Sequence, residues 1–444
     1  MALLFDTLFQ ATDNTSSGRR SQKNKRKTTS DLQGATAASV AKRRRKAVAT
    51  KDQPDIGSWF NVEELSAKTR AAEVLHTAPS HHIRLGSDFT GYGTDSLAFH
   101  YLGLMYKAVF VAELNPEKDI LRVALEKNVT HKEPQVKYRD VKNRSTKNAP
   151  ACDVFITGPP CVTFSTLGKR KGAAVAKGQL MLYSLQYIVD KLPRVVIIEN
   201  VRGLTHKRNA GLLQHVKDCL QAAKYTVHLR VMCTSDSAVP QSRGRCYLVG
   251  IRSPKVAFQW PKPLPPVGLE HFLDKNLKNT EHCLTHRQKR IMHTLQGKHK
   301  GKLEKSWYCF DAGASEKFVS CLKDKCPCLT RARAGGHYVP RLRRFLSVVE
   351  HGSLQGLPRR VTQHMVEACE GNERVVRAAL GDAMSLNVLM RVLSKALYSA
   401  GFINNVPVDP WRQLAKDMAK CDLRHCGPRV LPDTYLEQDG AVLK

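Results

Sequence analysis

An unbroken apolar run over residues 195–198 is the feature that most constrains how this chain folds. The run is Val195-Val196-Ile197-Ile198, which is β-branched throughout, and charge returns only at Glu199. A strand that is apolar on both of its faces is typical of the middle of a parallel sheet. The run therefore predicts an α/β fold with a mostly parallel sheet and a carboxylate at the end of a buried strand.

A second buried strand is predicted at residues 153–157, and it ends abruptly. Gly158, Pro159 and Pro160 stop the strand and fix the backbone that leads to Cys161. An open α/β sheet places its ligands just beyond the carboxyl ends of its strands. Cys161 is therefore a candidate for chemistry, against the alternative of a small buried cysteine that only packs.

Two earlier strand ends carry groups that suit an adenosine-type cofactor. The first predicted strand, residues 83–89, runs into a turn at 90–95 whose glycines let a ligand approach the backbone closely. The second, residues 109–114, carries Glu113 near its end, where a carboxylate can bind ribose hydroxyls. Asp140, at a third strand end, is a further candidate contact.

Basic groups and one carboxylate suit a nucleic-acid substrate. Arg243 and Arg245 alternate, so in an extended chain their guanidinium forks point the same way, toward a phosphate or a base carbonyl. The glycine-bounded basic loop 168–172 suits closure over a phosphate backbone. Burial of Glu199 predicts a raised pKa and a role as proton donor, against the alternative of a glutamate that caps the next turn.

The charge of the chain points to a polyanionic partner. The 444 residues carry a formal net charge of +32, which favours nucleic acid. We expect the basic tail 1–55 to be disordered, and its clusters at 23–27 and 42–46 favour nuclear localisation or nucleic-acid binding. No secretory signal, bilayer-length apolar run or disulfide framework is recognisable, so we expect a reducing, intracellular setting and no membrane.

The remaining segments divide the chain further. Residues 56–80 are expected to form a helical lead-in, residues 255–328 an irregular, smaller second region, and the tail 401–444 is uninformative. Several candidate zinc ligands lie close together in sequence: Cys309, Cys321, Cys326, Cys328 and His337. Their spacing fits no standard zinc pattern, so we expect packing thiols and no metal.

Together these segments resemble the C5-cytosine DNA methyltransferase family over residues 83–397, apart from the irregular region. The resemblance rests on motifs in family order: Asp88-Phe89-Thr90-Gly91-Tyr92-Gly93, Pro160-Cys161 with Phe164-Ser165, Glu199-Asn200-Val201, Gln241 with Arg243 and Arg245, Leu354-Gln355-Gly356-Leu357-Pro358, and Gly381-Asp382-Ala383 with Asn387-Val388. It implies catalytic roles for Cys161, Glu199, Arg243 and Arg245. It implies an S-adenosylmethionine site at Phe89, Thr90, Gly91, Gly93, Glu113, Leu114, Asp140, Val141, Pro160, Leu180, Asp382 and Ala383.

The resemblance also implies a fold and an activity. The fold would be a Rossmann-like S-adenosylmethionine-dependent methyltransferase sheet at 81–254, a target-recognition region at 255–328 and a return to the catalytic domain at 329–400. The activity would be DNA (cytosine-5)-methyltransferase, acting in the nucleus on double-stranded DNA. A methyl group would reach C5 of a flipped-out cytosine through a covalent Cys161 adduct. The alternatives are a tRNA cytosine-5 methyltransferase, of whose Cys-Phe-Thr signature Cys309-Phe310-Asp311 is a partial match, and a non-catalytic DNA-binding regulator.

Three positions depart from the family pattern. Val162 replaces the glutamine that usually follows the nucleophile, and Asp382 replaces an asparagine. Ser87 stands where the first strand usually ends in an acidic residue, with Asp88 beside it. The departures at Ser87 and Asp382 bear on the affinity for S-adenosylmethionine.

Overall fold

The computed structural model describes residues 82–160, 180–274, 277, 284–333, 336–420 and 433–436 of the chain. It separates residues 1–52 from residues 53–444, and all described residues belong to the second unit. The predicted tail and helical lead-in, the basic loop 168–172, Cys161 and Val162 lie outside the described residues.

Seven strands form one sheet in the order β3-β2-β1-β4-β5-β8-β6. Their bounds are β1 Ile83–Asp88, β2 Tyr106–Ala112, β3 Val136–Tyr138, β4 Val154–Thr157, β5 Val195–Val201, β6 Tyr225–Cys233 and β8 Gly244–Arg252. Strands β1 to β5 pair in parallel, and β8 lies antiparallel between β5 and β6. With helices on both faces, this sheet confirms the predicted Rossmann-like α/β fold.

The apolar run that predicted the sheet lies in its interior as β5, between parallel β4 and antiparallel β8, and not in the middle of the parallel strands as expected. Val195 and Ile197 pack into one core, whereas Val196 and Ile198 pack into another on the opposite face. Helices α5 (Leu180–Lys191) and α6 (Ala210–Ala222) contribute to the second core. Helices α2 (Thr94–Tyr101), α3 (Pro116–Leu125) and α11 (Leu386–Ala400) are among those that contribute to the first core.

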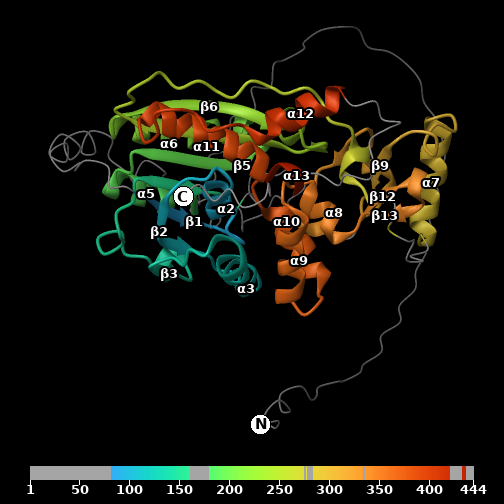
Figure 1. Ribbon diagram of the computed structural model, residues 1–444, viewed down its shortest axis with the longest axis horizontal. Coiled ribbons are helices and arrows are strands. Elements are labelled where there is room, and N and C mark those ends of the chain that lie inside the picture. The colour runs from blue at the N-terminus through green and yellow to red at the C-terminus, as the bar shows by residue number, and fades with distance from the viewer. Residues whose placement is uncertain are drawn as a thin grey trace, which may run out of the picture. The chain divides into compact units, whose positions relative to one another are not determined.

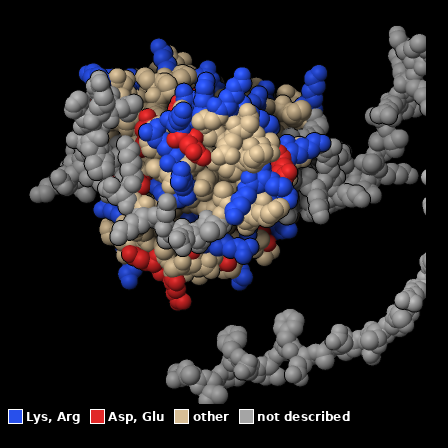
Figure 2. All heavy atoms as spheres, turned by 90° about the vertical axis from the view of Figure 1, so that its right-hand side faces the viewer, with Lys and Arg blue, Asp and Glu red and all other residues tan. Residues whose placement is uncertain are grey.

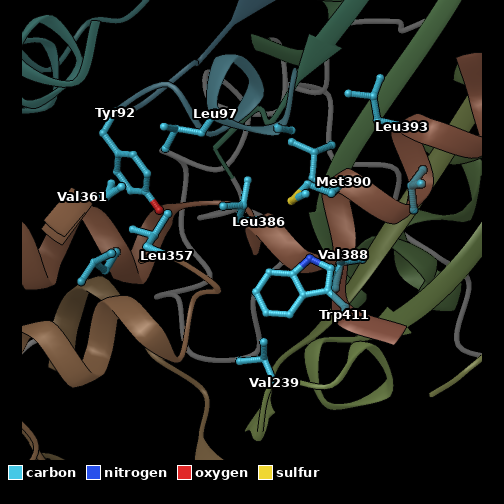
Figure 3. Packing of buried hydrophobic residues seen from close by; sticks show 14 of the residues in the cluster. Tyr92, Leu97, Val239, Leu357, Val361, Leu386, Val388, Met390, Leu393 and Trp411 are labelled. Atoms are coloured by element: carbon cyan, nitrogen blue, oxygen red, sulfur yellow. The ribbon is translucent and has the colours of Figure 1, made fainter. Parts of the chain in front are cut away.

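Helix α11 brings a late part of the chain back to the sheet. Nearly all of its residues are buried. In Figure 3, Leu386 of α11 lies between Tyr92, from the turn after β1, and Trp411 of α12 (Pro410–Lys420). The return segment therefore shares a core with the turn that follows β1.

The region predicted to be irregular contains its own small fold. A four-stranded antiparallel sheet has the order β10-β9-β12-β13, with bounds β9 Tyr308–Asp311, β10 Cys321–Lys323, β12 His337–Val339 and β13 Arg344–Phe345. Helix α7 (His286–Lys298) packs on it through Ile291 and Leu295, and a capping box of Thr285 and Gln288 begins this helix. Because β12 pairs with β9, the sheet extends past the predicted boundary at residue 328.

Short elements connect the two sheets. They are β7 Gln241–Ser242, β11 Cys326–Pro327, α8 Val348–Ser353, α9 Arg359–Ala368, α10 Glu373–Asp382 and, after α12, α13 Asp433–Leu436. Figure 1 shows α7, β9, β12 and β13 to the right of the seven-stranded sheet, with α8, α9 and α10 between. Over the stretches of chain that are described, no helix combines the length and apolar character needed to cross a bilayer.

Candidate functional site

The turn after β1 has the backbone of a ligand-binding loop. Phe89, Gly91 and Gly93 all lie in the left-handed region, with φ of 56°, 62° and 88°. The amide of Thr90 donates to the Ala112 carbonyl oxygen at 3.2 Å, which ties the turn to the end of β2. The turn lies at the carboxyl end of β1, where the strand order of the sheet reverses, and this is where such sheets bind their ligands.

Glu113 lies directly beside this turn. Its carboxylate accepts from the Gly91 amide at 2.8 Å and from the Asn115 amide at 2.9 Å. The neighbouring Leu114 is 58% exposed, and Asn115 caps α3, in which Pro116 is the first residue. A carboxylate and an exposed apolar side chain therefore stand together at the end of β2.

Asp140 follows β3, the neighbour of β2. Its carboxylate accepts from the Lys142 amide at 3.0 Å and caps the short turn that begins at the buried Val141. Because β1, β2 and β3 are adjacent and parallel, Phe89, Glu113 and Asp140 lie along one edge of the sheet.

These residues fit an adenosine-type cofactor such as S-adenosylmethionine. A side-chain carbon added at Gly91 would meet nothing within 4 Å, so there is open space above the turn. The Glu113 carboxylate is suited to ribose hydroxyls, and the exposed Leu114 side chain is suited to the face of a base. Thr90, Gly93, Leu180, Asp382 and Ala383 remain predicted contacts.

A second group of predicted residues meets at the ends of β4 and β5. Pro159 and Pro160 follow β4, and the Asn200 side chain of β5 donates to the Pro159 carbonyl oxygen at 3.2 Å. A side-chain carbon at Gly158 would lie 3.7 Å from Glu199 Oε2 and 2.9 Å from Met384 Cε. Glycine at 158 therefore keeps the turn that leads to Cys161 close to the Glu199 carboxylate.

Glu199 and Arg245 form an ion pair across β5 and β8. Glu199 Oε1 is 3.2 Å from Arg245 Nε, and Glu199 is only 7% exposed. Burial raises the pKa of the Glu199 carboxyl, as predicted, while Arg245 and Arg243 oppose that rise. The site therefore holds a carboxyl group that takes up a proton more readily than an exposed glutamate.

Arg243 has a different environment from Arg245. Its buried guanidinium donates to the carbonyl oxygens of Leu329 at 2.7 Å, Gly381 at 3.2 Å and Ala383 at 2.5 Å. Burial and the nearby Arg245 lower the pKa of Arg243. Through these contacts Arg243 connects β8 to residues 381–383. A direct catalytic role for it stays a prediction.

The last motif joins several segments. Asp382 lies 2.9 Å from Lys118 of α3 and 3.4 Å from Arg331, which follows β11 in the chain. Gln241 donates to the Leu354 carbonyl oxygen at 2.6 Å and accepts from the Leu329 amide at 3.1 Å. Motifs that lie far apart in sequence are thus connected by hydrogen bonds and ion pairs near the ends of β4 and β5.

Sequence reasoning missed a buried polar network behind the site. Asp88 lies 2.8 Å from Arg144 and accepts from the Ser184 hydroxyl at 2.8 Å, and that hydroxyl lies 3.2 Å from the Thr157 hydroxyl. The sequence placed Asp88 in the motif of the cofactor turn and beside Ser87, but it did not predict this network, and Arg144 and Ser184 carried no sequence signal. Their roles depend on chain segments that only the folded sheet brings together.

The candidate zinc ligands of the small region do not converge. Among the described residues, no three His, Cys, Asp or Glu side chains are arranged to hold a metal ion. The buried thiols of Cys309 and Cys326 are in contact, with their sulfur atoms 3.8 Å apart.

Comparisons with known proteins agree with this geometry. The family model described as C-5 cytosine-specific DNA methylase matches residues 83–397. Type II methyltransferase M.Bsp6I of Bacillus sp. (strain RFL6) is 30% identical, over 41% of this chain and 57% of that protein. Type II methyltransferase M.HhaI of Haemophilus parahaemolyticus is 31% identical, over 30% of this chain and 45% of that protein. Orphan methyltransferase M.Rho11sI of Bacillus phage rho11s is 28% identical, over 38% of this chain and 33% of that protein, so the match spans well under two thirds of each relative.

Solved structures support the fold. The S. pombe Dnmt2 methyltransferase superposes with a TM-score of 0.50 at 16% identity, covering 71% of this chain and 98% of that one. A mutant of Spodoptera frugiperda DNMT2 gives 0.52 at 16% identity, covering 72% of this chain and 100% of that one. The match of the family model over most of the described chain, on a fold and a site of the expected kind, shows that this chain belongs to the C-5 cytosine-specific DNA methylase family.

Proposed function

We propose that this protein transfers a methyl group from S-adenosylmethionine to C5 of a cytosine in double-stranded DNA. The observation that carries the proposal is the buried Glu199–Arg245 pair beside the Pro159-Pro160 turn that leads to Cys161. A thiol, a carboxyl of raised pKa and a guanidinium are the groups that activation of a pyrimidine ring requires.

Each group has a distinct task in the proposed reaction. The Cys161 thiolate adds to C6 of cytosine, and this addition makes C5 nucleophilic. Protonated Glu199 donates its proton to N3 as charge builds on the ring, and Arg245 holds the O2 carbonyl. When bound, S-adenosylmethionine supplies the methyl group that C5 takes up. Water then takes up the C5 proton, the Cys161 sulfur leaves C6 as a thiolate, and the N3 proton returns to Glu199, which restores the aromatic ring and the starting state of the site.

The small region supplies a cationic surface suited to a phosphate backbone. Its exposed basic residues come from α7, from the small sheet and from their connections: Arg287, Lys289, Lys298, Lys300, Lys302, Lys305, Lys317, Lys323 and Arg341. Figure 2 shows Lys and Arg side chains spread over this side of the molecule around an uncharged area. Phe318, 67% exposed, adds an aromatic surface that can contact bases. We infer that this region reads the DNA target.

Methyl transfer from labelled S-adenosylmethionine tests the proposal. Duplex DNA and tRNA are offered in parallel, with Cys161→Ala as the inactive control. Label that enters DNA and disappears with Cys161→Ala supports the proposal. Label that enters tRNA alone would show that the substrate is RNA and not DNA. If neither is labelled, the chain would be a DNA-binding protein without this activity.

The nuclear location is part of the proposal and rests on the basic clusters at 23–27 and 42–46. A fluorescent fusion of the full chain is expected to enter the nucleus of a eukaryotic cell. Replacement of the basic residues at 42–46 by alanine should shift it toward the cytoplasm, and an unchanged distribution after replacement of both clusters would contradict this part.

A further inference from the structure

The turn after β1 lacks the acid that the family usually places at the end of the first strand. Ser87 stands there, and the neighbouring Asp88 is not a substitute, because its carboxylate is engaged by Arg144 and Ser184 behind the sheet. The left-handed backbone at Phe89 is unfavourable for a residue with a side chain, so the turn needs support from its surroundings.

A different carboxylate supports the turn from the opposite side. Asp95, in the first turn of α2, is only 3% exposed. It accepts from the Thr90 hydroxyl at 3.0 Å and 3.1 Å and from the Ser96 amide at 2.9 Å. The Ser87 hydroxyl also hydrogen-bonds to it. One carboxylate therefore connects the end of β1, the glycine turn and the start of α2.

Asp95 is a buried carboxylate, and burial of its charge lowers the stability of the fold unless hydrogen bonds compensate for the lost water. Burial raises the pKa of the Asp95 carboxyl, and the hydrogen bonds from Ser87, Ser96 and Thr90 oppose the rise. The nearby Arg122 guanidinium is paired with Asp119 and Glu126. Hydroxyl and amide groups of β1, of the turn and of α2 are thus the partners of this buried carboxylate in the described structure.

We propose that Asp95 is the positioning residue of the cofactor turn, and that it supplies from α2 the carboxylate that the family usually has at position 87. The inference rests on the proposed function, because it assumes that S-adenosylmethionine binds at this turn. Ser87 and Asp95 are then a matched pair: the hydroxyl at 87 leaves room for the carboxylate that arrives from 95.

Binding of S-adenosylhomocysteine, measured by titration calorimetry on the full chain, tests this inference without any need for turnover. Asp95→Ala should weaken binding about ten- to a hundredfold, the usual effect of losing charge-assisted hydrogen bonds. Adding Ser87→Asp to Asp95→Ala should recover most of the affinity, because a carboxylate then reaches the turn from the end of β1. Glu126→Gln, a buried carboxylate that does not contact the turn, is the matched control and should bind within about twofold of wild type.

The outcomes separate the inference from the proposed function. A folded Asp95→Ala protein that binds S-adenosylhomocysteine as wild type does would overturn the inference alone. Failure of Ser87→Asp to rescue would also overturn it. If wild-type protein does not bind S-adenosylhomocysteine, the proposed function falls first. Should Asp95→Ala fail to fold by circular dichroism, Asp95→Asn takes its place, because it keeps the volume and one acceptor oxygen; it should still bind several-fold more weakly than the Glu126→Gln control, and equal binding would overturn the inference.

Discussion

The Arg144 guanidinium lies 2.8 Å from the Asp88 carboxylate, and both side chains are fully shielded from solvent. Asp88 ends β1, and its second partner, Ser184, belongs to α5 and reaches Thr157 at the end of β4. The segment that carries Cys161 runs between β4 and α5. The contacts from Asp88 to Ser184 and from Ser184 to Thr157 therefore connect β1 to the elements on both sides of that segment.

Breaking the Asp88–Arg144 pair should strongly destabilise the fold. Arg144→Met leaves a buried carboxylate without its cation and should lower the free energy of unfolding by about 3–5 kcal/mol. The pair Arg84–Asp153, at 2.7 Å but with the Arg84 side chain 43% exposed, is the matched control, and Arg84→Met should cost about 1 kcal/mol or less. Urea unfolding of both variants checks this, and equal losses would show that burial does not set the value of the pair.

The sheet could be predicted from the sequence because its central strands are apolar on both faces. The runs that became β4 and β5 are buried on both faces, and such runs have few other places in a fold. The turns at Gly91 and Gly158 could be predicted because glycine and proline residues end the preceding strands there. Other site positions, such as Leu114, Leu180 and Asp382, followed from the resemblance to the family and not from a physical argument.

The small sheet and the polar networks could not be read in this way. Strands such as β12 and β13 have three and two residues, too few to show a period, and their pairing depends on partners distant in the chain. The alternation of Arg243 and Arg245 put both on one side, but it could not reveal that backbone carbonyls of Leu329, Gly381 and Ala383 surround Arg243. Asp95 ended the predicted turn 90–95 and carried no signal of its own.

The two arginines of β8 should separate into a structural and a catalytic residue. Arg243→Lys loses the planar fork that reaches carbonyl oxygens in two directions, so it should lower the free energy of unfolding by about 2–3 kcal/mol. Arg245→Lys should cost about 1 kcal/mol or less and reduce kcat about a hundredfold. Thermal unfolding and labelled methyl transfer measure the two effects, and a stable, inactive Arg243→Lys protein would instead place Arg243 in the reaction.

Glu199 should give the protein a specific pH dependence. Burial raises the pKa of its carboxyl above the ordinary value of 4.5, so between the two values the folded state holds a proton that the unfolded state has released. The free energy of unfolding therefore falls as pH rises through that window, and Glu199→Gln lacks this part of the slope. Urea unfolding at about pH 5, 6 and 7 compares the two proteins; parallel curves would mean that Glu199 has no raised pKa.

The same variant should report on the reaction. Glu199→Gln cannot donate the proton to N3, and kcat is expected to fall by about a hundredfold or more. Binding of S-adenosylhomocysteine should be unchanged, because Glu199 lies at the end of β5, apart from Glu113 and the turn after β1. A loss of binding equal to the loss of rate would assign Glu199 to the cofactor pocket.

The aspartate at position 382 should not weaken the affinity for the cofactor, although the family usually has asparagine there. Lys118 at 2.9 Å and Arg331 at 3.4 Å balance its charge, so a bound cofactor would not meet an uncompensated carboxylate. Asp382→Asn should therefore leave the affinity for S-adenosylhomocysteine within about threefold of wild type. Because the Asp382 side chain is 33% exposed, the variant should lower the free energy of unfolding by about 1 kcal/mol or less at low salt and by less at high salt. Calorimetry and urea unfolding at two salt concentrations measure both quantities, and affinity that rises tenfold in Asp382→Asn would show that the aspartate is a true impairment of the pocket.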